Sequence, residues 1–231
     1  MEIDMTVGTK SILFGVHCFF IHPWIVAIAW WKLYGFPYDL RLWVAFFIHD
    51  LGYLGKPNMD GEEGERHPEL GARIMGWLFD KEAPSEKPLF SERNNWDIWA
   101  MVKHNYILRY SEHGFWYRFV YYHSRFLCKQ NGHHYTPLCV ADKLAIVIEP
   151  SWMYLPRAWL SGELHEYIAQ AKQKHQDVVI LSREAEGVDW ILPSRIWHKG
   201  VKRYCRNWVH EHRNGKIDSK TKARNHTNTG E

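Results

Sequence analysis

The stretch Trp43-Val-Ala-Phe-Phe-Ile-His49-Asp50 sets a histidine and a carboxylate directly behind six apolar residues. A run of this kind predicts a helix that packs in a protein core, with His49 and Asp50 at its end. Burying an ionised carboxylate beside an imidazole costs free energy unless a cation pairs with it. The dipeptide therefore predicts that a cation, most simply a metal ion, lies next to this helix end.

Other histidines and one aspartate also lie on or beside apolar segments. They are His22, His67, His104, His123 and Asp142. His22 and His67 each precede a proline, which favours the first position of a helix. Asp142 lies in an otherwise apolar helix face, and Lys143 is expected to point about 100° away around that helix. Imidazoles and carboxylates brought together from several helices make a divalent-metal site.

Outward from this stretch, apolar residues recur at helical spacing and predict an all-α fold. Helices are expected at 11–20, 23–34, 40–51, 67–79, 96–108, 116–130, 137–149, 155–174 and about 193–212. Residues 84–95 have the composition of a loop, and only 177–182 resembles a strand. We predict a metal-binding helical domain at 1–150, a helical extension packing on it at 151–213, and a disordered polar tail at 214–231.

Composition narrows the class of protein. The 231 residues are 46% apolar and 16% aromatic, enough for a thick core, and the formal charge of +3 is too small to predict binding to nucleic acid. The four cysteines form no Cys-x-x-Cys pair, which fits buried, reduced thiols in a cytoplasmic protein. Residues 11–31 carry no formal charge, but His17, His22 and Pro23 argue against a membrane span. No signal peptide is expected.

Four motifs within residues 11–150 together resemble the HD superfamily of metal-dependent phosphohydrolases. Phe47-Ile-His49-Asp50-Leu-Gly-Tyr53-Leu-Gly-Lys resembles the family's His-Asp-Ile-Gly-Lys signature, with Tyr53 in place of a lysine. The segment after His22 resembles the first-histidine helix. His67-Pro-Glu-Leu-Gly-Ala resembles the His-Pro-x-x-Gly-Ala motif of two-metal members, and Cys139-Val-Ala-Asp142 resembles the final Ala-Asp motif. The resemblance implies an HD-domain helical bundle.

Two of the ligand positions have competitors. His17 lies five residues before His22, and we favour His22 because the helix after it has the family's small-apolar rhythm. His104 and His123 both end apolar runs, and we favour His123 because Arg125 adds a nearby cation. The predicted cofactor is one or two divalent ions (Mn, Fe, Co, Ni or Zn) per chain. The predicted metal ligands are His22, His49, Asp50, His67, His123 and Asp142.

The polar segments near these motifs supply candidate catalytic residues. Lys56 and Arg125 are cations that could bind phosphate, although Arg125 could equally form a surface ion pair. Glu62 and Glu63, together with Glu65, could act as a general acid or base. The alternative for this acidic run is that it stabilises the start of the next helix through the helix dipole.

The resemblance implies hydrolysis of a phosphoester or phosphoanhydride, most plausibly of a nucleotide, as the function. The alternative is a di-iron oxygenase of a small polar substrate, since some HD-fold proteins such as myo-inositol oxygenase use a similar six-ligand set. A third hypothesis is a signalling or binding module that keeps the metal site but does not catalyse a reaction. No Gly-Tyr-Pro motif follows His104 or His123, which argues against a cyclic dinucleotide. The expected binding partner is a small phosphorylated molecule, and we expect no binding to a membrane or to nucleic acid. A homo-oligomer is possible, because the helices predicted within residues 151–231 could form a dimer interface.

Overall fold

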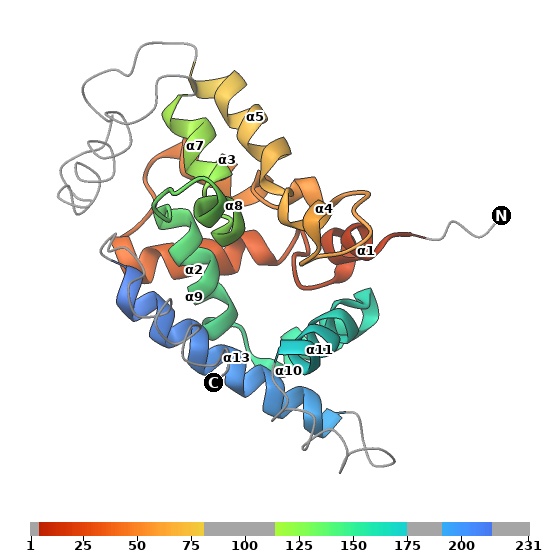
Figure 1. Cartoon of the computed structure of the whole chain (residues 1–231). Coiled ribbons are helices and arrows are strands. Elements are labelled where there is room, and N and C mark those ends of the chain that lie inside the picture. The colour runs from red at the N-terminus through yellow and green to blue at the C-terminus, as the bar shows by residue number, and fades with distance from the viewer. Residues whose placement is uncertain (1–4, 81–113, 175–190, 214–231) are drawn as a thin grey trace, which may run out of the picture.

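The chain is helical throughout the part that the computed structural model describes, residues 5–80, 114–174 and 191–213 (Figure 1). No strand occurs in these ranges, and the prediction of an all-α fold is confirmed. The predictions for 84–95, 96–108, 177–182 and the tail 214–231 lie outside the described residues. The elements are α1 (Val7–Phe14), α2 (His22–Tyr34), α3 (Leu40–Ile48), the 3-10 turn η1 (Leu51–Tyr53), α4 (Glu62–Glu65), α5 (Pro68–Phe79), α7 (Phe115–Tyr121), α8 (Arg125–Gln130), α9 (Pro137–Ile148), α10 (Ser151–Ser161), α11 (Glu163–Lys174) and α13 (Ile191–His212).

Local capping explains where several helices begin. The Asp39 carboxylate accepts the Arg41 N–H at the start of α3, and the Thr136 hydroxyl accepts the Cys139 N–H at the start of α9. Such caps satisfy backbone donors that a helix leaves without an internal partner. Pro23 and Pro68 occupy the first turns of α2 and α5, where a missing N–H costs nothing. These starts are within a residue of those that the sequence predicts.

Four predicted helices were wrong in extent. The helix expected at 40–51 is α3, which ends at Ile48, and a separate 3-10 turn follows it. The helix expected at 11–20 is α1, which ends at Phe14. Its end is closed by the Gly15 N–H, and Glu163 then accepts the N–H of Val16. The helix expected at 116–130 is divided between α7 and α8, because Ser124 caps a new helix through the Leu127 N–H. The helix expected at 155–174 is two helices, since Gly162 between them has a φ of 89°, a left-handed conformation that favours glycine.

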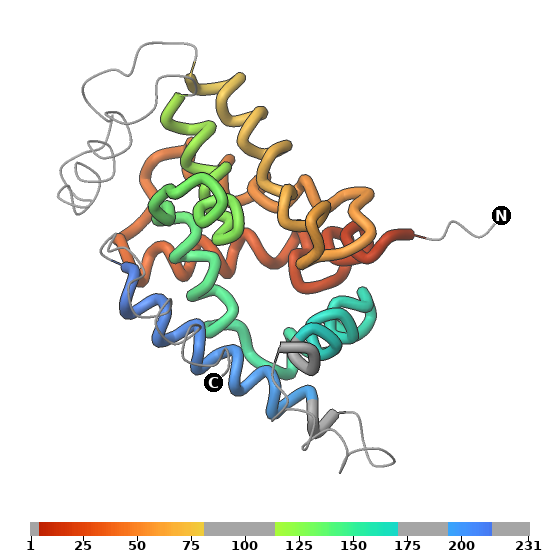
Figure 2. The backbone as a smooth tube through the Cα atoms, viewed as in Figure 1, coloured from red at the N-terminus to blue at the C-terminus, as the bar shows by residue number. Residues whose placement is uncertain are grey.

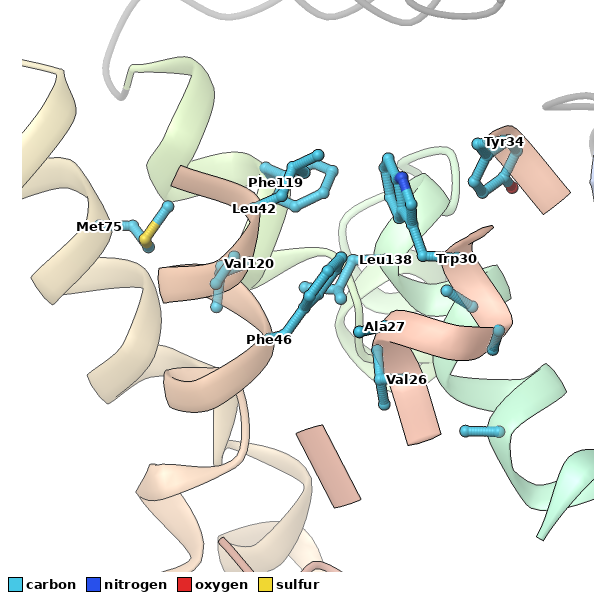
Figure 3. Packing of buried hydrophobic residues seen from close by; sticks show 14 of the residues in the cluster. Val26, Ala27, Trp30, Tyr34, Leu42, Phe46, Met75, Phe119, Val120 and Leu138 are labelled. Carbon is cyan, nitrogen blue, oxygen red and sulfur yellow. The ribbon is translucent and has the colours of Figure 1, made fainter. Parts of the chain in front are cut away.

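The main core lies where α2 and α3 pack against α5, α7 and α9 (Figure 3). Trp30 of α2 is 1% exposed, and its ring contacts those of Tyr34, Phe46 and Phe119 at centroid distances of 4.8, 5.6 and 6.0 Å. Aromatic pairs at such distances stabilise a core beyond the area that they bury. Much of the aromatic excess in the sequence is therefore used for packing.

The helices after residue 150 pack on those before it (Figures 1 and 2). Helix α13 lies along α9, where Trp208 and Val209 contact Cys139 and Val140. Helix α10 lies against α1. The predicted domain boundary at 150 stays a prediction. All four cysteines are buried and free, and none of the described helices is long and apolar enough to cross a membrane.

Candidate metal centre

Six buried side chains, the ones that the sequence predicts as metal ligands, come together in two groups that share one residue. The shared residue is Asp50. Within each group, one nitrogen or oxygen from every member lies within 4.8 Å of the others. The groups are His22, His49, Asp50 and Asp142, and Asp50, His67 and His123. Both sets combine imidazole with carboxylate, so each could hold a divalent metal ion.

Five of these residues lie at the ends of helices, and this is why segments far apart in the chain can meet. His22 begins α2, His49 directly follows α3, and Asp50 precedes η1. His67 precedes α5, and His123 lies in the turn between α7 and α8. A side chain at a helix end can point past the helix toward its neighbours, and Asp142, in the middle of α9, supplies the remaining carboxylate.

The two oxygens of Asp50 divide between the two groups. Oδ2 lies 3.0 Å from His49 Nε2 and 3.3 Å from His22 Nε2. Oδ1 lies 3.5 Å from His67 Nε2 and 3.4 Å from His123 Nε2. A carboxylate placed in this way can bridge two metal ions, one on each side.

Backbone carbonyls fix the orientation of three of the imidazoles. Nδ1 of His49 lies 2.8 Å from the Phe46 oxygen, and Nδ1 of His67 lies 2.8 Å from the Gly64 oxygen. Nδ1 of His123 makes the same kind of contact three residues back. A carbonyl can only accept, so Nδ1 carries a proton in each ring, and Nε2 is the nitrogen that can offer a lone pair to a metal ion. This is the arrangement that second-shell hydrogen bonds impose on metal-binding histidines.

Several polar atoms inside the cluster have no suitable protein partner. Nε2 of His67 and Nε2 of His123 lie 3.1 Å apart, so two ring nitrogens of the same kind face each other. His49 Nε2 and Asp50 Oδ2 lie 3.0 Å apart, but within the described part of the chain both are buried without a hydrogen bond of normal geometry. Buried polar atoms without partners cost free energy, and a cation between them would remove that cost. The donor set therefore fits a metal ion.

Two glycines let the segments that carry these ligands approach closely. A Cβ added at Gly52 would lie 1.9 Å from the backbone oxygen of His67, and one at Gly71 would lie 2.5 Å from the oxygen of Ile48. Real Cβ atoms do not make contacts this short. The glycines therefore allow η1 and the start of α5 to hold Asp50 and His67 next to each other.

The charges of the cluster shift its pKa values. Burial by itself would raise the pKa of Asp50, but His49 and His17 lower it well below its ordinary value. Burial and the neighbouring His123 lower the pKa of His67 well below its ordinary value. Burial also lowers the pKa of His22, whereas the charge of Asp50 outweighs burial at His49 and raises its pKa. An anionic Asp50 beside a neutral His67 is the protonation state that metal binding requires.

Asp142 is held by a cation from its own helix. Its Oδ1 lies 3.1 Å from His22 Nε2, and its Oδ2 accepts a hydrogen bond from Lys143 Nζ at 2.9 Å. Burial would raise the pKa of Asp142, but Lys143 and His22 lower it well below its ordinary value. The expectation that Lys143 points away from Asp142 was wrong, because its flexible side chain bends back. One oxygen of Asp142 nevertheless faces the histidines.

None of the four predicted catalytic residues has its side chain at the cluster in the described structure. Glu62 and Glu63 are exposed on α4, and Lys56 is half-buried, with no hydrogen bond or ion pair from its amine to a ligand among the described residues. Arg125 turns toward α13, where its Nη2 donates to the hydroxyl of Tyr204 at 2.6 Å. Their catalytic roles stay predictions.

Glu65 differs from the other acidic residues of this run. It is half-buried, and its Oε2 accepts a hydrogen bond from the Ser124 hydroxyl at 3.5 Å, next to His123. Burial, with a contribution from Asp60, raises the pKa of Glu65 to about 7. Nothing in the acidic run itself marks which carboxylate turns inward, so the sequence predicts Glu65 only together with Glu62 and Glu63.

The sequence left two choices between candidate histidine ligands, His17 or His22 and His104 or His123, and the structure describes both members of only the first pair. His22 is in the cluster, whereas His17 lies beside it, with its ring centroid 5.4 Å from that of His22 and 4.9 Å from that of Tyr53. His123 is in the cluster, and His104 lies outside the described residues.

Comparison with protein-family models, with curated proteins and with solved structures found no match for this chain. The described part of the chain is all-α and contains a buried His/Asp cluster that could hold a metal ion.

Proposed function

We propose that this protein is a metal-dependent phosphohydrolase of the HD type. The observation that carries the proposal is the position of Asp50, whose two oxygens each face a separate pair of imidazole nitrogens. Such a bridging carboxylate suits a site for two ions, and the sequence around it resembles the His-Asp signature of the HD superfamily.

The chain's own residues have separable tasks in this proposal. His22, His49 and Asp142 would hold one ion with Asp50, and His67 and His123 would hold the other. When bound, divalent ions lower the pKa of bound water and polarise a phosphoryl oxygen. The Nδ1 hydrogen bonds to backbone carbonyls keep Nε2 of these three rings turned inward, an orientation that supports binding of the ions.

An anionic substrate is supported by the charge at the edge of the cluster. The Lys143 side chain is 25% exposed while its amine pairs with Asp142, so it can also meet a ligand from solvent. A phosphorylated small molecule, in particular a nucleotide, is the substrate class that we propose. The nucleotide part rests on the resemblance alone.

The test begins with the metal. Protein purified without chelator would be analysed for bound elements and assayed for phosphate release from a panel of nucleotides and p-nitrophenyl phosphate. A His49→Ala/Asp50→Ala variant should lose both metal and activity. His165→Ala, on the exposed face of α11, is the matched control and should keep both.

The alternative chemistry gives a different result in the same experiment. Two irons per chain, consumption of oxygen and no release of phosphate would favour a di-iron oxygenase, for which the four histidines of the cluster are also suitable ligands. A wild type that holds no metal even after reconstitution would overturn the enzymatic proposal altogether.

A further inference from the structure

A buried carboxylate from the C-terminal helices reaches the residue next to the metal cluster. Glu163, the first residue of α11, has a fully buried side chain, and its Oε2 lies 3.3 Å from Nδ1 of His17. These residues are 146 positions apart in the chain. Neither was predicted as a metal ligand, and neither is in the two ligand groups.

Glu163 is held rigidly from several sides. Its Oε1 accepts the Val16 N–H at 2.9 Å and the Ser161 hydroxyl at 2.7 Å, and its Oε2 accepts the Tyr167 hydroxyl at 3.1 Å. Donors on both oxygens fix the carboxylate in one orientation. Burial alone would raise the pKa of Glu163, but His17 and these donors lower it, so the group is an anion at neutral pH.

The anion in turn fixes the ring of His17. A carboxylate can only accept, so the close approach of Glu163 Oε2 requires a proton on Nδ1. Ser11 Oγ lies 2.9 Å from the same nitrogen. Nε2 is on the other side of the ring and has no hydrogen-bond partner among the described residues. The His17 side chain is 16% exposed, so it is not completely sealed from solvent.

The ring of His17 lies beside the metal cluster. His17 packs edge-on against His22, a member of the first group, and its ring is tilted against that of Tyr53. Tyr53 in turn stacks on His67, a member of the second group, at a centroid distance of 3.9 Å. A carboxylate that orients an imidazole whose second nitrogen faces the reacting groups is an arrangement that recurs in hydrolytic sites.

We infer that Glu163 is a positioning residue that presents His17 Nε2 to an oxygen of the phosphoryl group of the substrate. The inference rests on the proposed function of the same site. Phosphate groups carry both P–O and P–OH oxygens at neutral pH, so Nε2 finds a partner whether it donates or accepts. Helix α11 would then be part of the substrate site and not only an extension that covers the core.

The test measures binding of inorganic phosphate to manganese-loaded protein by titration calorimetry, with metal content and Tm as parallel readouts. His17→Asn is the sharpest variant, since its amide can still reach Glu163 and Ser11 while the distal nitrogen is removed. We expect unchanged metal content and a loss of phosphate affinity of at least tenfold, as for a lost hydrogen bond to a charged group. His17→Gln, whose amide nitrogen can occupy the place of Nε2, should recover part of the affinity.

Helix α11 offers a matched control. Glu163→Gln should weaken phosphate binding, because the ring of His17 is no longer held by a charge. Glu166→Gln, one turn further on, loses the carboxylate that accepts the N–H groups of Met59 and Asp60 and should leave phosphate binding unchanged. An equal loss in both variants would mean that any loosening of α11 weakens the site, and would overturn the inference.

Other outcomes separate this inference from the proposed function. Loss of a metal ion in His17→Asn would make His17 a ligand and overturn its proposed role. An active, metal-loaded wild type that binds no phosphate, or whose His17→Asn variant binds phosphate as well as wild type does, would overturn the inference alone. A wild type without metal would overturn the proposed function, and the inference with it.

Discussion

Replacing Gly52 by alanine should separate Asp50 from His67 without removing either ligand. The added Cβ would lie 1.9 Å from the backbone oxygen of His67, about 1.5 Å short of the 3.4 Å at which ordinary contact begins in a close-packed interior. Both partners are backbone, so no flexible side chain can move aside. The segments that carry Asp50 and His67 must move apart instead.

The size of this movement decides the expected result. Asp50 Oδ1 and His67 Nε2 are 3.5 Å apart, and metal–ligand distances tolerate changes of only about 0.2 Å. A shift several times larger should empty the group of Asp50, His67 and His123 first. Overpacking of this kind costs about 1–3 kcal/mol of folding free energy, so the protein should still fold at room temperature.

The assay is elemental analysis of metal-reconstituted protein, together with thermal unfolding. Gly52→Ala should hold about one ion fewer per chain than wild type and should melt at a lower temperature. Gly200→Ala in α13 is the matched control, because no heavy atom lies within 4 Å of its added Cβ. The control should keep its metal and gain up to about 1 kcal/mol from helix propensity. Wild-type metal content and stability in Gly52→Ala would refute the reasoning.

Three further perturbations follow from the same structure. Asp50→Ala should abolish binding of both ions, whereas His123→Ala should remove only one; equal losses by elemental analysis would contradict a bridging role for Asp50. Because the pKa of Glu163 is lowered from its ordinary 4.5, its stabilising effect is present above pH 4.5 and is lost as the pH falls through the folded value. The Tm difference between metal-free wild type and Glu163→Gln should therefore be largest at neutral pH and shrink in acid; a constant difference would count against the charged pair. Trp30→Ala should cost about 3–5 kcal/mol in urea unfolding, and a cost under 1 kcal/mol would show that its 1% exposed ring is not a central part of the core.

Candidate ligands that stand at helix ends could be recognised from the sequence, because neighbouring residues mark those helix ends. A proline behind His22 and another behind His67 mark helix starts, and the apolar run before His49 marks a helix that ends in the core. The choice of His123 was also made from adjacent residues, and the structure brings it to Asp50. Its role as a metal ligand stays a prediction, as it does for the other five.

Helix ends that fall inside a continuous run of apolar residues at helical spacing could not be predicted from the sequence. The run that contains His123 reads as one continuous helix, but Tyr122 accepts hydrogen bonds from Thr136 and the chain turns there. Helix α1 stops at Phe14 where Glu163, far along the chain, accepts the next free N–H. Such breaks depend on partners that a local pattern does not contain.

By itself, the sequence determined that this chain is helical, where most of its helices start, and that histidines and aspartates stand at the ends of apolar segments. Only the tertiary structure decided that Asp50 lies between two pairs of imidazoles, that Glu65 and not Glu62 or Glu63 turns inward, and that α11 supplies Glu163 to His17. The physical reason is the range of the interactions. Capping and periodicity act over a few residues, whereas the contacts that assemble the cluster form only when distant helices bury their apolar faces together.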